Sequence, residues 1–525
     1  MRRSASSRSS KDDEYGRSRQ APKYFIMTSS NCMRLGITDV VSMVRARQLS
    51  PVELVQAYLD RIELINPSLN IYLTVMADEA LATAKAAEHA VIAGDALGPL
   101  HGIPVALKDN CEVAGVRMTG GNKFLRDHVA TADAEVVSRL RQAGAIILGK
   151  LNMHEWAIGG TTRNPHYGPC RNPWDPARIP GGSSGGSGAA VTADMALATI
   201  GTDTGGSVRI PAALNGVCGL RPTMGRVSNQ GVIPVSWSFD TVGPLARRAE
   251  DIAHVLQALA GYDPEDLSCV DKPAGNYLTE LHAGVSGLRV GLLGGHFQQE
   301  PQPDVVKLIV QAAQVYEDLG AHIEEVELPD AAATIERTSE MLLAEAAAFH
   351  QARLAERSED FGPDVLTRLR IGTQVSGSQY GRNRQEQRRW QRQLQQTFTR
   401  YDLLLAPTCG IPAPVIEESE GVETTRLLAR FTYPLSLAQL PVLSVPCGFT
   451  KDQLPVGMQL IAPAWAEARI LCAAHAYQQA TDWHMQASRH FPLLTKESIG
   501  EDKQGTPLNE AQTNPYALSY TREQH

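Results

Sequence analysis

The sequence is poor in the features that mark several classes of protein. Only 20% of its 525 residues are charged and 6% are aromatic, and glycine and proline number 44 and 31, a combined level below that of low-complexity or collagen-like chains. No run approaches the roughly 18 consecutive apolar residues of a membrane span. Acidic residues outnumber basic ones and give a net charge of -8. We therefore expect an ordinary globular protein with neither a nucleic acid nor a membrane as its partner.

Metal-binding and disulfide patterns are also absent. The eight cysteines are scattered and none forms a C-x-x-C pair, which excludes zinc-ribbon and thioredoxin-type motifs. Buried thiols in a reducing compartment fit this pattern, so we expect a cytoplasmic protein. His154-Glu155 does not start an H-E-x-x-H zinc motif, because Ile158 occupies the place of the second histidine.

Helical and strand-like patterns alternate between about residues 35 and 494. Ser50-Pro51-Val52-Glu53 predicts a helix start with Ser50 as the N-cap, and the helix should stop before Pro67. Further helices are predicted over 78–93, 134–143, 305–319, 332–356 and 385–400. Buried strands are predicted over 103–107, 145–148, 196–200, 290–293, 322–326, 403–406 and 442–445. This alternation indicates an α/β fold, with a central mixed sheet covered by helices on both faces.

We predict one large domain over residues 35–494, because no Pro/Ser-rich linker interrupts that region. Residues 1–34 are rich in serine and basic residues and lack an apolar segment, so we expect a disordered tail rather than a secretory signal. Met27 and Met33 are alternative starts. Residues 495–525 are polar and without pattern, and we expect a flexible C-terminal tail.

Glycine is concentrated in two loops that each lead into a serine. The first, Gly181–Gly188, reads GGSSGGSG and precedes a helix of small residues that should begin at Ala189; the second, Gly201–Arg209, reads GTDTGGSVR and follows a predicted strand. Glycine lets the chain turn sharply and lets a ligand approach the backbone. Consecutive N–H groups in such loops also bind an oxyanion.

Three other interpretations of these loops are disfavoured. A phosphate loop needs a lysine after its glycines, and none follows. Gly182 to Gly186 matches the G-x-S-x-G nucleophile elbow around Ser184, but the preceding Arg178-Ile179-Pro180 is a poor strand end. A Ser-His-Asp triad needs a specific histidine. The histidines near these motifs in sequence are His101, His154 and His166, and none stands in a recognisable triad context.

The paired loops closely resemble the signature of the amidase signature hydrolases, G-G-S-S-G-G-S, a spacer, and G-T-D-x-G-G-S-[IV]-R. The similarity extends over roughly residues 40 to 480, through residues 102–109, 149–153, 219–223, 239–244 and, more faintly, 455–460. Leu151 departs from the threonine that members often carry after Gly-Lys. That difference lies at a flank of the site.

The resemblance implies a Ser–Ser–Lys triad. Ser207 would be the nucleophile, Ser183, on a cis peptide bond after Gly182, the bridging serine, and Lys108 the base. Lysine acts as a base only when neutral, so its pKa must fall from about 10.4 toward neutrality. The end of an apolar strand provides the burial that lowers it.

The resemblance also assigns supporting roles. The oxyanion would be held by the backbone N–H groups of Thr204, Gly205, Gly206 and Ser207. Ser184 should hydrogen-bond within its own loop. Asp203 and Arg209 should orient the second loop, with a purely structural ion pair as the alternative. Lys150 belongs to a different stretch of the resemblance, and we expect it at the surface.

Aromatic side chains near the motifs are candidates for the wall of the substrate pocket. They are Trp156, Trp237 and Phe239, and packing in the core explains them equally well. Specificity should also depend on parts of residues 360–440 that the sequence does not place.

These observations lead to a hydrolase that cleaves a carbon–nitrogen bond through an acyl-enzyme on Ser207, without metal or organic cofactor. The expected substrate is a small-molecule amide, anilide, carbamate or urea. The alternative is the glutamine-hydrolysing subunit of a tRNA-dependent amidotransferase, which shares the signature but works in a complex. A third hypothesis, a binding protein on an inactive scaffold, is disfavoured by the joint presence of Lys108, Ser183 and Ser207. The substrate and the oligomeric state, a homodimer included, stay open.

Overall fold

A single mixed sheet of eleven strands organises the described chain. The computed structural model describes residues 33–419 and 421–492, and its strand order is β1-β3-β2-β6-β8-β7-β12-β13-β11-β9-β10. The strands are β1 (Tyr72–Val75), β2 (Pro104–Lys108), β3 (Ile146–Leu151), β6 (Ala198–Asp203), β7 (Cys218–Arg221), β8 (Thr241–Ala246), β9 (Arg289–Leu293), β10 (His322–Val326), β11 (Leu403–Pro407), β12 (Val442–Phe449) and β13 (Pro455–Ile461). A separate hairpin pairs β4 (Arg163–Asn164) with β5 (Gly168–Pro169).

Parallel pairing links β3, β2 and β6 at one end of the sheet and β11, β9 and β10 at the other, whereas the strands between them pair antiparallel. Because β2 and β6 are parallel neighbours, the residues at their carboxyl ends come together at one edge of the sheet. Lys108 ends β2, and the first three residues of the second glycine loop, Gly201 to Asp203, belong to β6 itself, which extends beyond its predicted end at Ile200.

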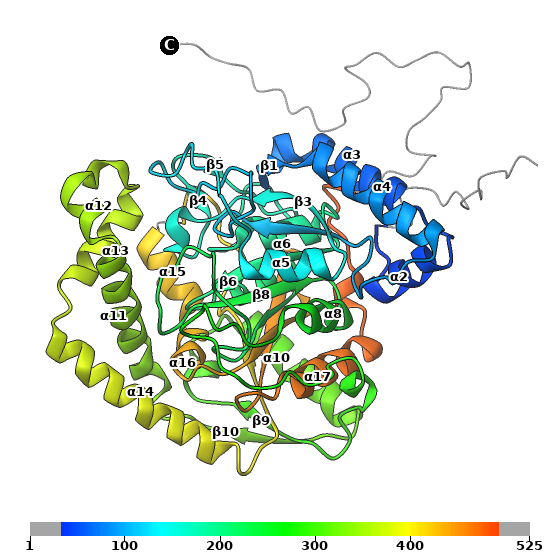
Figure 1. Ribbon diagram of the computed structural model, residues 1–525. Coiled ribbons are helices and arrows are strands. Elements are labelled where there is room, and N and C mark those ends of the chain that lie inside the picture. Colours follow the sequence, from blue (N-terminus) through cyan, green and yellow to red (C-terminus); the bar gives the residue numbers. More distant parts are fainter. Residues whose placement is uncertain (1–32, 420, 493–525) are drawn as a thin grey trace, which may run out of the picture.

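Helices cover both faces of this sheet (Figure 1). They are α2 (Ile37–Arg45), α3 (Pro51–Leu69), α4 (Ala77–Ala93), α5 (Glu135–Gln142), α6 (Gly185–Thr192), α7 (Arg209–Asn215), α8 (Ala249–Leu259), α9 (His296–Gln299), α10 (Pro303–Asp318), α11 (Ala331–Phe349), α12 (Gln351–Glu356), α13 (Pro363–Thr373), α14 (Gly377–Thr397), α15 (Gly421–Ala429), α16 (Tyr433–Leu437) and α17 (Glu467–Ala480). The predicted α/β class, a single domain built on a mixed sheet, is confirmed.

Local signals in the sequence place several of these helices correctly. Ser50 caps α3, and its Oγ accepts hydrogen bonds from the N–H groups of Val52 and Glu53 at 3.1 and 3.2 Å. The helix does not stop before Pro67, however, but continues to Leu69 and ends at Asn70 in the left-handed conformation. Burial of Ile65 and Leu69 favours this last turn despite the N–H that the proline lacks.

The sequence patterns do not predict β1, β7, β8 and β13, and two of these, β8 and β13, contain strand-breaking residues. β8 includes Gly243 and Pro244, and β13 begins at Pro455, yet both pair antiparallel with neighbours in the middle of the sheet. The predicted helix over 332–356 is divided at His350 into α11 and α12. The helix predicted over 385–400 is α14, which begins earlier, after Ser376 as its N-cap.

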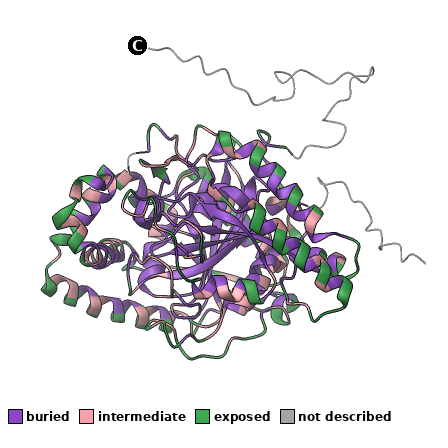
Figure 2. Cartoon of the chain, turned by 45° about the horizontal axis from the view of Figure 1, so that its top comes forward, coloured by how far each residue is buried: buried purple, intermediate pink, exposed green. Residues whose placement is uncertain are grey.

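The core lies on and around the sheet, whose strands are mostly buried, while the peripheral helices have exposed outer faces (Figure 2). All seven described cysteines are free and six of them are buried, in agreement with the expected buried thiols. Within the described residues, no helix is both long and apolar enough to cross a membrane. The predicted tails, 1–34 and 495–525, lie outside the described residues except for 33 and 34.

Candidate active site

Lys108 is held at the end of β2 between two hydroxyl groups. Its Nζ lies 2.7 Å from Ser183 Oγ and 2.7 Å from Thr202 Oγ1. All three side chains are buried. Burial disfavours the charged ammonium and lowers the pKa of Lys108 from 10.5 to about 7, although Cys111, Asp240 and Asp203 act in the opposite direction. The expected shift toward neutrality is therefore present.

Ser183 reaches Lys108 from a tightly packed loop. The Gly182–Ser183 peptide bond is cis, as the resemblance implies. A side chain at position 182 would lie 2.8 Å from the backbone of Gly160 and Thr161, so only glycine fits there. The carbonyl oxygen of Ser183 accepts a hydrogen bond from the N–H of His154 at 3.0 Å. α6 begins at Gly185, four residues before the predicted start, because the glycines pack against neighbouring backbone instead of forming an open loop.

Ser207 lies between β6 and α7, beside the first glycine loop. The N–H of Ser184 donates to the carbonyl oxygen of Ser207 at 3.2 Å, which joins the two loops. Ser207 is only half-buried, whereas the residues around it in the loop are buried. Its side chain borders a narrow cavity of about 40 Å³, lined by Gly160, Gly182, Ser207, Arg368, Thr425 and Tyr433 among others. The structure thus brings both loop serines and Lys108 to one region.

The second glycine loop presents several N–H groups without a protein acceptor. Among the residues that the structure describes, the N–H groups of Thr204, Gly205 and Ser207 have no such partner. The N–H of Gly206 donates to Asp203 Oδ1 at 2.9 Å and is therefore engaged, in contrast to the role expected for it. A side chain at position 205 would collide with the ring of Tyr433, which keeps this stretch of backbone bare.

Asp203 holds this loop through two arginines. Its carboxylate contacts Arg209 Nη2 at 2.9 Å and Arg221 Nη1 at 3.0 Å, and all three side chains are fully buried. Burial alone would raise the pKa of Asp203, but the two guanidinium groups and the N–H of Val208 hold it well below its usual range. Asp203 and Arg209 thus form a buried ion pair within the second loop, and the sequence does not predict the contact with Arg221.

Ser184 and Lys150 differ from expectation. Ser184 Oγ bonds outside its loop, to the carbonyl oxygen of Thr202 at 3.2 Å and its N–H at 3.3 Å, because the start of α6 lies directly against β6. Lys150 is fully buried, not exposed, and its Nζ forms an ion pair with Asp109 at 2.9 Å. This partner compensates the buried charge, so Lys150 is a structural cation.

The three aromatic candidates do not line the cavity at Ser207. Trp156 is buried and packs against Phe124 and His350, and Phe239 is fully buried. Trp237 has 55% of its surface exposed. Their proximity to the motifs in sequence is not proximity to the cavity in space, because each side chain points into the core or into solvent.

The wall of the cavity is instead completed by helices far along the chain. Arg368 comes from α13, Thr425 from α15 and Tyr433 from the start of α16. Nothing in the local sequence distinguishes these residues from ordinary surface or core positions. They belong to the region 360–440 whose placement the sequence left open.

The nearby histidines serve as structural groups. His154 Nε2 lies 3.0 Å from Asp364 Oδ2, and His166 Nε2 lies 2.9 Å from Glu155 Oε1. His101 Nε2 contacts the carbonyl oxygen of Ala87 at 3.0 Å.

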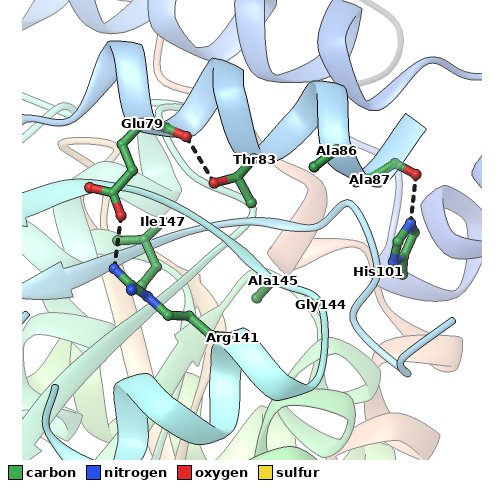
Figure 3. Close-up of a pocket in the computed structure, with 9 residues that line it drawn as sticks. All are labelled: Glu79, Thr83, Ala86, Ala87, His101, Arg141, Gly144, Ala145 and Ile147. Carbon is green, nitrogen blue, oxygen red and sulfur yellow. Dashed lines mark hydrogen bonds and ion pairs between the residues drawn. The ribbon is translucent and has the colours of Figure 1, made fainter. Parts of the chain in front are cut away.

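His101 also borders a second hollow, between α4 and the turn after α5 (Figure 3). The charged groups at its wall are already paired, since Arg141 bonds to Glu79 at 2.8 Å. Its walls, as Figure 3 shows, contain neither loop serine nor Lys108.

Comparison with known proteins extends over most of the chain. Residues 53–471 match the family described as Amidase. A glutamyl-tRNA(Gln) amidotransferase subunit from Azotobacter vinelandii is 41% identical over 483 residues, which cover 87% of this chain and 100% of that protein. The crystal structure of the corresponding subunit from Thermotoga maritima is 31% identical, with a TM-score of 0.75 and coverage of 88% and 97% of the two chains.

A further structural neighbour belongs to a vestigial protein complex described as revealing the evolutionary origins of an s-triazine catabolic enzyme. It is 35% identical, has a TM-score of 0.81, and covers 85% of this chain and 99% of its own. The amidase scaffold is therefore common to proteins with different names, and it identifies a C–N hydrolase without identifying the substrate.

These relatives correct two expectations. The main hypothesis of a small-molecule amidase is wrong, because the curated relatives that match this chain at about 40% identity are named as subunits of a tRNA amidotransferase. The expectation that no nucleic acid is involved is wrong for the same reason. The substrate was mistaken because the motifs around Ser207 indicate the reaction and not the acyl donor. The nucleic acid was missed because a net charge sums over the whole chain and can conceal a local basic surface. The homodimer stays a prediction.

Proposed function

This chain belongs to the amidase signature family, and from that premise we propose that it is the glutamine-hydrolysing subunit of a tRNA-dependent amidotransferase. The observation that carries the proposal is the similarity to the curated glutamyl-tRNA(Gln) amidotransferase subunits, which are 39–42% identical to this chain over 96–100% of their own length. In this role the chain would release ammonia from glutamine for transfer to a glutamyl-tRNA.

We assign the nucleophile to Ser207 and proton transfer to Ser183 and Lys108. Neutral Lys108 accepts the proton of Ser183, which accepts that of Ser207 as its Oγ attacks the side-chain amide of glutamine. The 2.7 Å between Nζ and Ser183 Oγ, and the pKa of Lys108 near 7, support this direction of transfer at neutral pH. The proton then returns through Ser183 to the departing ammonia, and a glutamyl ester is left on Ser207.

Hydrolysis of the ester repeats the sequence with water as the nucleophile. Both steps develop negative charge on the former amide oxygen. The unpaired N–H groups of Thr204, Gly205 and Ser207 support an assignment as its donors. Gly206 is left out of this set because its N–H already donates to Asp203.

Arg368 supports recognition of an amino acid. Its Nε donates to Asp364 at 3.0 Å, and its Nη2 donates to Thr425 Oγ1 at 2.9 Å and to the carbonyl oxygen of Gly421 at 2.5 Å. Its Nη1 has no acceptor among the described residues and is free to meet the α-carboxylate of glutamine. No carboxylate lines the cavity, so an ammonium group would meet hydroxyl and backbone acceptors there.

The proposal is tested by ammonia release from glutamine and by transfer to tRNA. The chain, purified with its partner subunits, should form glutaminyl-tRNA(Gln) from glutamyl-tRNA(Gln) and glutamine carrying a ¹⁵N amide, and the label should appear in the product. Ser207→Ala should lower ammonia release by about 10⁴-fold or more. Ser187→Ala is the matched control, because Ser187 is a buried serine of the neighbouring first glycine loop, at the start of α6, and its Oγ donates only to the carbonyl oxygen of Ile200.

Two outcomes would contradict the proposal. One is rapid turnover of simple anilides or ureas by a preparation that does not hydrolyse glutamine. The other is glutamine hydrolysis that survives Ser207→Ala, which would leave the reaction but remove the assigned nucleophile.

A further inference from the structure

α14 carries a concentration of arginine that the net charge of the chain conceals. Its 21 residues include five arginines and a single acidic residue, Glu386, in a protein whose overall charge is -8. α14 runs along the edge of the molecule (Figure 1). Its inner side is fixed to α16 by Trp390 Nε1, which donates to the carbonyl oxygen of Pro434 at 2.6 Å, and by Gln387 Nε2, which donates to that of Leu437 at 3.0 Å.

Four of the arginines project to solvent on one side of the helix. They are Arg382, Arg388, Arg389 and Arg392, all exposed, and we refer to them as the α14 basic face. At 3.6 residues per turn they fall within about 120° of one another and extend over about 15 Å. This surface is long enough to follow several consecutive phosphates.

Most of this charge is not compensated within the chain. Arg389 pairs with Glu386 at 2.6 Å, and Arg382 donates to the side-chain amide oxygen of Gln379. Arg388 and Arg392 have no partner among the described residues, although they stand four residues apart, where like charges destabilise a helix. The pair Arg388 and Arg392 therefore lowers helix stability without forming a contact inside the described chain, and binding of an external anion would account for it.

A cavity of about 500 Å³ adjoins the C-terminal half of α14. Its walls include Gln391 and Gln395 of α14 and Phe398 just after its end, together with Gln439, Ser268 and Trp465. No carboxylate lines it, and aliphatic residues such as Leu394 and Leu440 stand beside the aromatic, amide and hydroxyl groups. These groups stack on a nucleobase and hydrogen-bond to its edges. We refer to this hollow as the Trp465 cavity.

Two further cations stand against Trp465. Arg226 Cζ lies 4.6 Å and Lys272 Nζ 5.2 Å from the centre of its ring. The loop before Lys272 also carries four acidic residues: the carboxylates of Asp263 and Asp266 accept hydrogen bonds from Ser228 and from the N–H of Asn229, whereas Glu265 and Asp271 are exposed. Arg226 is buried and lies 3.7 Å from Glu467 Oε2, so the exposed cation at this wall of the cavity is Lys272.

We propose that the α14 basic face and the Trp465 cavity together form an RNA-binding surface. The arginines contact the phosphate backbone of the tRNA, and the cavity takes an unpaired base against Trp465. An acidic protein surface would satisfy the arginines alone, whereas the aromatic and amide lining of the adjoining cavity favours RNA. The inference rests on the proposed function for the identity of the RNA, but binding is measured without catalysis.

The test uses the full-length chain and a fluorescently labelled tRNA(Gln) transcript, with anisotropy recorded over a salt titration. The variant Arg382→Gln/Arg388→Gln/Arg392→Gln should bind about tenfold or more weakly and reduce the slope of log K against log salt by about 2. Lys85→Gln/Arg126→Gln/Lys307→Gln removes the same charge from exposed positions elsewhere and should leave the slope unchanged. Ammonia release from glutamine should be the same in all three proteins, which separates this inference from the proposed function.

Trp465→Leu tests the cavity separately. Stacking is not an ionic contact, so this variant should weaken binding about fivefold or more at an unchanged salt slope. The inference is overturned if the wild-type chain does not bind the transcript at low salt, or if the arginine variant binds it as tightly as wild type. It is also overturned if polyglutamate displaces the transcript at equal charge concentration, which would identify an acidic protein as the occupant. Unchanged affinity of Trp465→Leu would remove the base from the proposal.

Discussion

Lys108 Nζ lies 2.7 Å from Ser183 Oγ, and both side chains are fully excluded from solvent. A buried ammonium is costly unless a carboxylate compensates it, and the two groups that Lys108 contacts are neutral hydroxyls. Lys150 is equally buried but pairs with Asp109 at 2.9 Å, so the two lysines differ in whether a carboxylate contacts the ammonium group.

The pH dependence of activity should follow Lys108. Because the neutral amine is the active form, kcat/KM for glutamine should rise as the pH increases through about 7, the pKa of Lys108. A pH profile of ammonia release measures this limb. A value of kcat/KM that stays constant from about pH 5.5 to 8.5 would contradict the assignment of Lys108 as the base.

The contribution of Lys108 to the free energy of unfolding should also increase with pH. The folded-state pKa of Lys108 is about 7 against 10.5 for the free side chain, so the unfolded chain binds more protons between these values. The contribution of Lys108 to the free energy of unfolding therefore rises from about pH 7 to pH 10.5. Lys108→Met should remove that rise, which urea denaturation at several pH values detects as a difference from wild type.

Thr202 should act by positioning Lys108. Thr202→Val keeps the shape of the side chain but removes the hydroxyl 2.7 Å from Nζ. We expect kcat to fall about tenfold with little change in KM. Thr199→Val is the matched control, since Thr199 is buried in the same strand and its Oγ1 donates only to the carbonyl oxygen of Ser187. Equal losses of kcat in the two variants would indicate a general effect of β6 packing instead.

Asp203 should stabilise the whole fold as well as the conformation of the second glycine loop. Asp203→Ala leaves Arg209 and Arg221 buried without their carboxylate, and a loss of about 3–5 kcal/mol in the free energy of unfolding is expected. Asp402→Ala breaks the more exposed pair with Arg289 and should cost much less, because solvent screens that pair. Denaturant titrations compare the two, and similar losses would argue against a structural role for the Asp203 cluster.

The contribution of Asp251 to stability should decrease as the pH rises, opposite to that of Lys108. Burial raises its pKa from 3.8 to about 7, although the N–H of Ile37 donates to its Oδ1 at 2.7 Å. The folded chain then binds more protons between these values, so stability from this group is full below about pH 4 and is lost as the pH rises to 7. Asp251→Asn retains an acceptor for Ile37 and should be at least about 1 kcal/mol more stable than wild type at pH 8. The exposed control Asp60→Asn should show no such dependence.

Much of the fold follows from local patterns. The buried strands β2 and β6 and the helix capped by Ser50 are expected from apolar runs and from capping residues, although β6 continues to Asp203, beyond its expected end at Ile200. β8 and β13 are not, because pairing on both sides in the middle of the sheet outweighs the unfavourable Gly243, Pro244 and Pro455. Pairing energy of that kind depends on strands that are distant in sequence.

Wall residues of the cavity could not be predicted for a related reason. Trp156, Trp237 and Phe239 were selected by nearness in sequence, but the direction of a side chain is decided by how its backbone turns and packs. Arg368 and Tyr433 carry no motif at all. They face the cavity because α13 and α16 fold back over the glycine loops.

The sequence by itself indicated the reaction class of this protein. The two glycine-serine loops match the amidase signature, and the resemblance to that family implies the role of Lys108; the requirement for a neutral lysine follows from elementary acid–base chemistry. Tertiary structure alone decided how that chemistry is supported. It placed Thr202 against Lys108, engaged the N–H of Gly206 with Asp203, and put Arg368 at the cavity. These contacts join residues whose proximity arises only when the sheet has formed and its helices have packed.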